Sequence, residues 1–309
     1  MIAHYTKSLS NTLFDIASHL QIEYNFSISH PDYETFSLPA LIAETIQRSS
    51  RRLQDKYLTL LLRNFLYGIY YNNSLQSVLA ANISNPNLLL HQDLENNCVF
   101  EIDWQFYNQL HDNNRGTGYL DSGWQVLRKE PDGSLAVTKD GLTLHVEENH
   151  LEATALSSRV DDLIAIRLPK NRLNNGFYLA VSNSGKQQQD DLQNNWGELE
   201  VISIFFNINP QGAIALMDSL TQQLNAAEIG FNFQVPHHPS GCDRYDSGIL
   251  NFQRQDYPRI QDLLKDIYAE HQCYFRPEIP LFTKFLAPGL SLAEQPIEKT
   301  LNKQSFGVN

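Results

Sequence analysis

Two Asp-Gly turns in the middle of the chain constrain its fold more than any other feature. They lie at 132–133 and 140–141, and each separates short runs in which apolar and polar residues alternate. Because Asp-Gly accommodates the positive φ angles of a tight hairpin turn, runs joined in this way are expected to pair as antiparallel strands. The runs at 124–127, 135–137 and 142–146 therefore predict a small β-meander.

The residues before the meander follow a helical pattern instead. Near the start of the chain, apolar residues recur every three or four positions: Leu9, Leu13, Ile16 and Leu20. The segment from Leu53 to Tyr71 is apolar on nearly all sides, which is typical of a buried helix. A polar, Asn-rich stretch at 112–116 separates the two patterns and is the predicted domain boundary. We therefore predict a mainly helical N-terminal region at 1–112 and an α+β region at 113–309.

The α+β region continues with more strands and two long helices. Strands predicted at 163–168 and 177–181 extend the meander region to 119–182, and residues 198–275 follow the order strand, helix, strand, strand, helix. The two helices carry apolar stripes: Ala213, Leu216, Met217, Leu220 and Leu224 in the first, and Ile260, Leu263, Leu264 and Ile267 in the second. Two long helices on a mostly antiparallel sheet is the simplest packing of these elements, so the predicted fold class is α+β.

The charge and cysteine content exclude several classes of function. The chain has 23 Lys and Arg against 35 Asp and Glu, and a net charge of −12 repels nucleic acid and acidic lipid. Cys98, Cys242 and Cys273 form no CxxC motif, which argues against disulfides and against a cysteine zinc site. Apolar runs are too short to span a membrane, and the start has no secretory signal. We expect a cytoplasmic protein without a metal or cofactor that binds neither nucleic acid nor membrane, with secretion as an effector left open.

Several peptides of the chain resemble the HopA family of bacterial effector proteins. They are RNFLYGIYYN at 63–72, IRLPKN at 166–171, PLFTK at 280–284, LAPGL at 286–290 and SFG at 305–307. The resemblance extends from about Asn25 to the C-terminus. Founding members of the family are type III effectors, and other members accompany peptide-modifying kinases in lanthipeptide and thioamide-peptide clusters. For the latter the resemblance implies a lyase that eliminates phosphate from phosphoserine or phosphothreonine and leaves a dehydroamino acid.

Such a β-elimination needs a base, an acid and cations around the departing phosphate. Arg244 lies where a looser resemblance to the phosphothreonine lyase effectors places a phosphate-binding arginine. Lys284 and Arg167 are the other predicted phosphate ligands, Lys170 is the candidate base, and His238 is the candidate acid.

Each of these residues also has a structural interpretation. Arg244 is flanked by Asp243 and Asp246, either of which could pair with it. Lys284 could extend along a strand with its ammonium in solvent, and Lys170 could lie in a solvated loop. His238 could be an ordinary loop histidine.

One departure from the lyase pattern is visible in the sequence. The strand predicted near 231–235 carries the lysine base in the phosphothreonine lyases, but here it offers Asn232 and Gln234. An amide cannot accept a proton from carbon. The leading prediction is a phosphoserine or phosphothreonine lyase that acts on a peptide phosphorylated by a separate kinase. The alternatives are a non-catalytic phosphopeptide- or partner-binding module and an effector-like protein.

Overall fold

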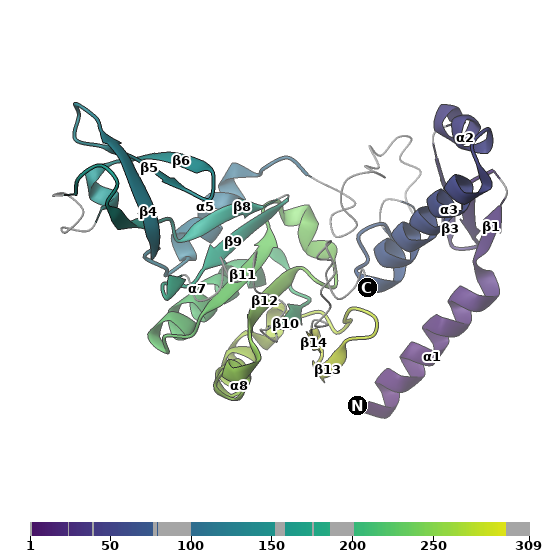
Figure 1. Cartoon of the computed structure of the whole chain (residues 1–309). Coiled ribbons are helices and arrows are strands. Elements are labelled where there is room, and N and C mark those ends of the chain that lie inside the picture. The colour runs from purple at the N-terminus through teal and green to yellow at the C-terminus, as the bar shows by residue number, and fades with distance from the viewer. Residues whose placement is uncertain are drawn as a thin grey trace.

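The computed structural model describes residues 2–23, 25–38, 40–76, 79, 100–151, 158–174, 176–185 and 201–294. Within these ranges the chain forms antiparallel sheets of three, four and seven strands together with several helices (Figure 1). The predicted α+β fold class is confirmed. Cys98 and the SFG peptide at 305–307 lie outside the described residues.

The N-terminal lobe comprises the described residues from 2 to 79. Its elements are α1 (Ile2–His19), β1 (Gln21–Glu23), β2 (Ser27–His30), β3 (Tyr33–Ser37), α2 (Ala40–Gln47), α3 (Arg51–Leu66) and a π-helix (Tyr67–Tyr71). The sequence predicts helices here, and the structure adds a small sheet. Ile28 and Phe36 pair across β2 and β3 and are buried in one core cluster with Phe65 of α3. An alternating pattern does not reveal these strands, because burial does not alternate along β1 or β3.

The predicted meander forms a four-stranded sheet in the order β6-β5-β4-β7. The strands are β4 (Tyr119–Lys129), β5 (Leu135–Lys139), β6 (Leu142–Val146) and β7 (Leu163–Leu168). Asp140 and Gly141 both have positive φ, at 51° and 81°, as a tight hairpin turn between β5 and β6 requires.

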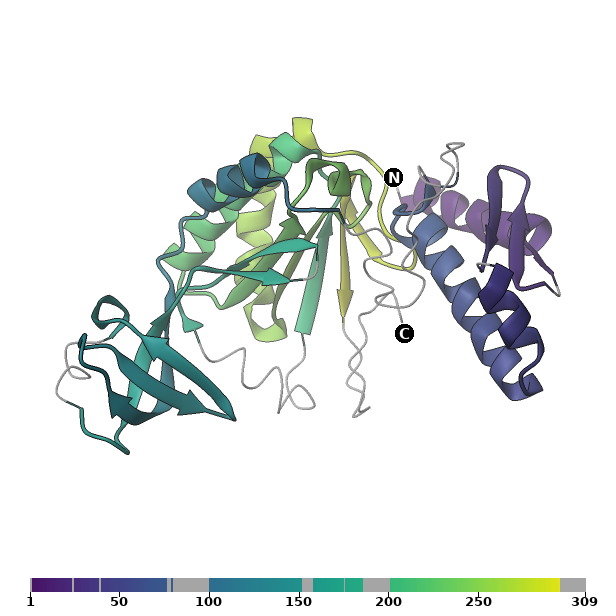
Figure 2. The ribbon, with the colours of Figure 1, turned by 90° about the horizontal axis from the view of Figure 1, so that it is seen from above.

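The seven-stranded sheet has the order β13-β14-β10-β12-β11-β9-β8. Its strands are β8 (Asn171–Asn174), β9 (Phe177–Val181), β10 (Val201–Phe206), β11 (Phe231–Pro236), β12 (Gly248–Gln253), β13 (Lys284–Ala287) and β14 (Leu290–Glu294). Strands β7 and β8 follow one another closely in the sequence but belong to different sheets. The N-terminal lobe and the four-stranded sheet lie at opposite ends of this sheet (Figure 2).

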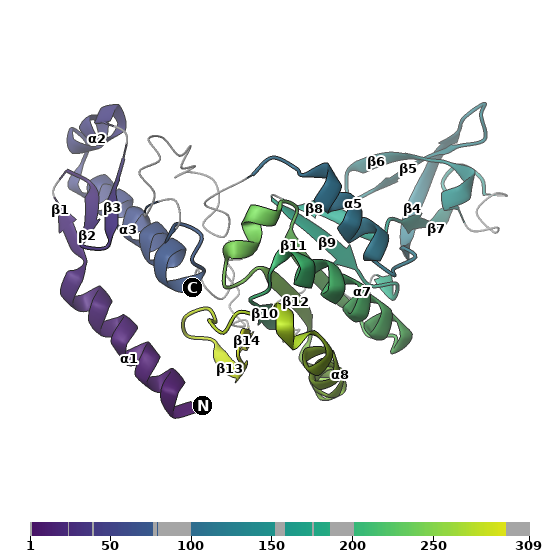
Figure 3. The same cartoon turned by 180° about the vertical axis from the view of Figure 1, so that it is seen from behind.

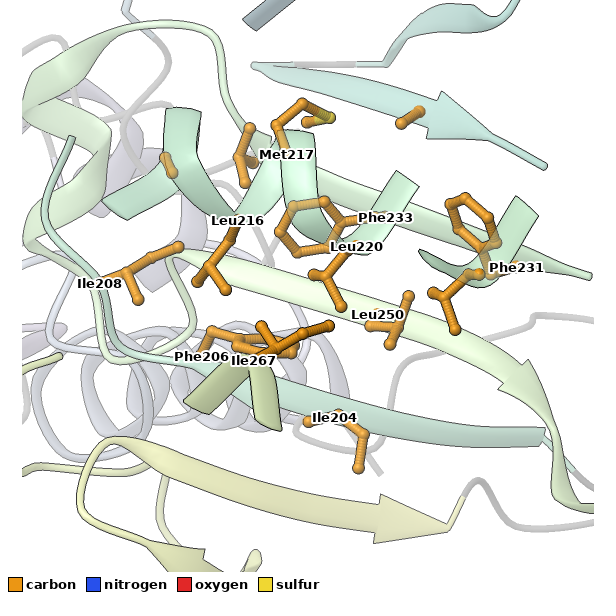
Figure 4. Close-up of a cluster of buried hydrophobic side chains, with 14 of the residues drawn as sticks. Ile204, Phe206, Ile208, Leu216, Met217, Leu220, Phe231, Phe233, Leu250 and Ile267 are labelled. Atoms are coloured by element: carbon orange, nitrogen blue, oxygen red, sulfur yellow. The ribbon is translucent and has the colours of Figure 1, made fainter. Parts of the chain in front are cut away.

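Helices α5 (Trp104–Asn113), α7 (Pro210–Ala226) and α8 (Tyr257–His271) cover one face of the large sheet (Figure 3). Helix α7 begins after Asn209, whose side chain accepts a hydrogen bond from the Gly212 amide, and Pro210 occupies its first turn. Figure 4 shows Leu216, Met217 and Leu220 of α7 against the sheet residues Phe233 and Leu250. Short 3₁₀ helices occupy Glu148–His150, Pro239–Asp243, Arg254–Asp256 and Gln272–Tyr274.

The N-terminal lobe contacts the large sheet through the end of its π-helix. The Tyr245 amide donates to the Asn72 carbonyl oxygen at 2.9 Å, and the Asn73 side chain donates to the Asp243 carbonyl oxygen at 3.3 Å. The Tyr71 ring meets the Phe205 ring of β10 edge to face at 6.4 Å. No helix in the described part of the chain is both long and apolar enough to cross a membrane.

Candidate functional site

Arg244, the first candidate phosphate ligand, is held by a carboxylate of its own chain. Its Nε donates to Asp246 Oδ1 at 2.7 Å and its Nη2 donates to Asp246 Oδ2 at 2.9 Å. Both residues are buried, with 6% of Arg244 and 1% of Asp246 exposed, and the guanidinium lies over the Phe177 ring. Because Asp246 occupies the two-pronged fork that would grip a phosphate, this geometry favours the ion-pair interpretation.

Lys170, the candidate base, directly precedes β8, and its ammonium group lies at the C-terminal end of α5. Its Nζ donates to the carbonyl oxygens of His111 and Asn114, both at 2.9 Å. Burial lowers the pKa of Lys170, with the Arg115 charge acting in the same direction and Asp112 opposing it. A lowered pKa suits a base, but an ammonium that caps two helix carbonyls is also a structural feature in its own right.

The sheet order separates the remaining candidate cations. Lys170 immediately precedes β8, and Lys284 begins β13, so the two lie at opposite edges with five strands between those edges. At about 4.8 Å per strand, this amounts to roughly 29 Å across the sheet. Arg167 is exposed on β7 in the other sheet. The structure therefore does not bring Lys170 and Lys284 to one phosphate.

His238, the candidate acid, begins the 3₁₀ helix at 239–243. Its Nδ1 accepts a hydrogen bond from the Ser240 amide at 3.1 Å, and its ring stacks on Phe100 at 4.9 Å. The neighbouring His237 is buried, and burial lowers the pKa of its ring, which a backbone hydrogen bond opposes. Of the two rings, the half-buried His238 is the one whose position suits an acid that meets substrate.

The face of the large sheet opposite the helices carries neutral polar groups. Asn232 of β11, Asn251 of β12 and Ser203 of β10 lie in one cross-strand row. The Ser203 hydroxyl donates to Asn251 Oδ1 at 2.7 Å. Gln234 points to the same face, since Phe231 and Phe233 of β11 point to the helices. Strands β10, β11 and β12 contain no ionisable side chain at all.

A cavity of about 500 Å³ lies between the N-terminal lobe and the segment that leads into β13. Its lining comes from five separate parts of the chain: Leu9, Thr12, Tyr33, Ile69, Tyr70, Gln76, Tyr245, Pro277, Glu278, Ile279, Leu281, Phe285 and Pro288. The volume is in the range of small-molecule and side-chain binding sites. Sequence reasoning missed this cavity because its residues are adjacent only in the folded chain.

Asp15, His19 and His30 could in principle hold a metal ion, since their ligand atoms all lie within 4.8 Å of one another. His19 Nδ1 lies 2.7 Å from Asp15 Oδ1, and the buried His30 Nε2 lies 3.3 Å from Asp15 Oδ2. His30 Nδ1 accepts a hydrogen bond from the Asp32 amide, so the proton of the neutral ring is on Nε2. A protonated Nε2 has no lone pair for a metal. His19 is hydrogen-bonded to Asp15, whereas the buried His30 Nε2 has no hydrogen-bond partner among the described residues, and we call these three residues the Asp15 cluster. The i, i+4 spacing of Asp15 and His19 was the signal in the sequence.

This cluster positions one wall of the cavity. The Tyr70 hydroxyl donates to Asp15 Oδ2 at 2.9 Å. Burial opposes ionisation of Asp15, but hydrogen bonds from His19 and Tyr70 and the nearby His30 outweigh it, and the pKa of Asp15 is lowered. The carboxylate therefore stays ionised beside the cavity and holds the Tyr70 ring in place.

Comparison with known proteins finds a family match in the C-terminal part of the chain. No curated protein matches it in sequence. Among solved structures, the effector protein from Pseudomonas syringae pv. tomato strain DC3000 is 14% identical with a TM-score of 0.38, covering 66% of this chain and 65% of that one. The effector protein from Pseudomonas syringae pv. syringae strain 61 is 14% identical with a TM-score of 0.36, covering 64% and 68%. The match thus spans just under two thirds of the first structure's length. The resemblance predicted from the sequence is confirmed for residues 168–309, which match the HopA1 effector protein family.

Proposed function

We propose that the protein is a non-catalytic binding module that grips a protein partner without changing it. The observation that carries this proposal is the chemistry of the three central strands. Strands β10, β11 and β12 contain no acid, base or cation, and the polar groups on their face opposite the helices are amides and a hydroxyl. Amides and hydroxyls can hold a polypeptide by hydrogen bonds, but they cannot remove a proton from carbon at neutral pH.

The buried ion pair between Arg244 and Asp246 supports the same proposal. A phosphate ligand needs guanidinium N–H groups that reach the substrate, whereas Arg244 is only 6% exposed and its Nε and Nη2 donate to Asp246. Releasing Arg244 to a phosphate would leave the Asp246 carboxylate buried without its main counter-charge, which is costly.

A phosphoserine or phosphothreonine lyase is the second candidate. One observation favours it: burial lowers the pKa of Lys170 and would make its amine a stronger candidate for the base. In that reading a separate kinase supplies the phosphorylated peptide, His238 donates the proton, and Arg244, Lys284 and Arg167 hold the phosphate. The wide separation of Lys170 and Lys284 across the sheet counts against this set acting together.

The test is incubation of the purified protein with phosphothreonine and phosphoserine peptides, followed by mass spectrometry. We expect the peptide masses to stay unchanged. Loss of phosphoric acid, with a dehydroamino acid left in the peptide, would overturn the non-catalytic proposal. If such loss occurs, Lys170→Met and Arg244→Ala would show whether the predicted base and ligand carry it, while Lys129→Met, a change of an exposed lysine on β4, serves as the matched control.

A further inference from the structure

The cavity between the N-terminal lobe and the β13 segment is lined by aromatic and aliphatic side chains. Tyr33 and Tyr70 come from the N-terminal lobe, and Tyr245 and Phe285 come from the large-sheet part of the chain. Leu9, Ile69, Ile279 and Leu281 add aliphatic side chains to the lining. Ring faces carry partial negative charge, so several rings around one space favour a cation within it.

The polar groups at this cavity also favour positive charge. The lining includes Glu278 and lacks any lysine, arginine or histidine. Burial raises the pKa of Tyr245, and the neighbouring Glu278 and Tyr33 add to that effect. Burial likewise raises the pKa of Tyr70, and Asp15, Tyr33 and Asp32 act in the same direction. The Asp15 carboxylate accepts a hydrogen bond from the Tyr70 hydroxyl at 2.9 Å and Glu278 belongs to the lining, so the cavity has negative charge on two sides of the chain's fold.

In the turn at 280–283, next in the chain to lining residues of the cavity, Phe282 has a strained backbone conformation. Phe282 has a φ of 66°, a conformation that bulky residues rarely adopt, and 62% of it is exposed. The turn is fixed because the Thr283 hydroxyl and amide both donate to the Pro280 carbonyl oxygen. Phe282 directly follows Leu281 of the lining and is therefore an exposed aromatic residue next in the chain to the cavity. Strain of this kind occurs preferentially at binding sites.

From these observations we infer that the cavity binds a lysine side chain on an otherwise apolar segment of a partner protein. The ammonium group would lie against the tyrosine rings and the Glu278 carboxylate, and its aliphatic stem would pack on Ile69 and Ile279. Apolar residues beside the lysine would pack on Leu281 and Phe282. The inference rests on the proposed binding function and names the chemical class of the partner. Charge complementarity supports it further, since the chain as a whole carries a net charge of −12.

Three short synthetic peptides test this inference against the full-length protein. They share flanking leucines and serines and differ only at the central position, which is lysine, norleucine or glutamate. Norleucine keeps the aliphatic stem and removes the ammonium group. We expect the lysine peptide to bind about tenfold more tightly than the norleucine peptide, measured by fluorescence anisotropy, and the glutamate peptide to bind most weakly. The preference for lysine should shrink as salt is raised.

Single substitutions of cavity residues test whether the lysine peptide binds in this cavity. Glu278→Gln should reduce lysine-peptide affinity about three- to tenfold and leave norleucine-peptide affinity unchanged. The side chain of Glu278 is exposed, so this change leaves the fold intact. Glu101→Gln removes the same charge from an exposed residue outside the cavity lining and is the matched control. Tyr245→Phe keeps the ring and should retain most of the affinity, whereas Tyr245→Leu should lose it.

Two results would overturn the inference: failure of the lysine peptide to bind more tightly than the other two, or equal effects of Glu278→Gln and Glu101→Gln. Neither result touches the proposed non-catalytic function, which phosphate loss from the phosphopeptides would overturn on its own.

Discussion

Asp246→Ala removes one half of the buried ion pair that holds Arg244. The arginine would keep its position over the Phe177 ring, 6% exposed, without the carboxylate that accepts its two hydrogen bonds. Breaking a buried pair by removing one partner costs about 3–5 kcal/mol, because a buried charge is left uncompensated. That is a large part of the roughly 5–15 kcal/mol by which domains are stable. For a domain of this size, each kcal/mol corresponds to roughly 2–4 °C, so the expected fall in Tm is roughly 6–20 °C.

Thermal unfolding followed by circular dichroism measures this shift. Asp262→Ala is the control, since Asp262 pairs with Lys265 on the surface of α8 with 79% of its side chain exposed. Exposed pairs contribute about 0–1 kcal/mol, so this variant should unfold within a few degrees of the parent protein. Equal shifts for the two variants would refute the structural role of the Arg244–Asp246 pair. A rise in the Tm of the parent protein with inorganic phosphate, abolished by Arg244→Ala, would show instead that the guanidinium opens to a phosphate.

Three further predictions concern other parts of the fold. Lys170→Met should destabilise the C-terminal end of α5 by about 1–2 kcal/mol through loss of its two hydrogen bonds to carbonyl oxygens, seen as faster amide exchange there. Because burial lowers the pKa of His237 below 6.5, the unfolded state binds more protons at mildly acid pH. The Tm should therefore fall as pH drops below about 6.5, and less so in His237→Leu than in His238→Gln. Gly289→Ala should be more destabilising than Gly141→Ala: both glycines have positive φ, but a Cβ at 289 would lie 2.1 Å from a backbone oxygen, whereas 141 has open space. The difference in Tm between these two variants measures the clash alone.

The elements with strong local signals were predictable from the sequence. The Asp-Gly turns gave the pairing of β4, β5 and β6, and apolar periodicity gave α7 and α8. Strand β8 was missed because its four residues, Asn171–Asn174, are polar or exposed and show no alternation with a buried face. The assignment of β7 and β8 to different sheets also has no local signal, since it depends on which distant strands are available for pairing.

The candidate site was also predictable only in part. The absence of a base on β11 was visible in the sequence, because the alternation of Phe231 and Phe233 fixes which face Asn232 and Gln234 occupy. The partner of Arg244 was not, because Asp243 and Asp246 lie one and two positions away from it and either could pair with it. Burial distinguishes them: Asp246 is 1% exposed and binds Arg244, whereas Asp243 is largely exposed and binds Arg276.

These two features together are the structural argument against a lyase site built from the predicted residues. An elimination needs a base near the substrate carbon and a cation near its phosphate at the same time, which places both groups within a few ångströms of one substrate residue. The central strands supply no base, Arg244 is closed by Asp246, and the cations at the two sheet edges are too far apart to replace them. Introducing a lysine by Gln234→Lys would restore only the base, with the arginine fork still occupied. On this geometry the single substitution is expected to leave phosphopeptides intact, and activity would require Asp246 to release Arg244 as well.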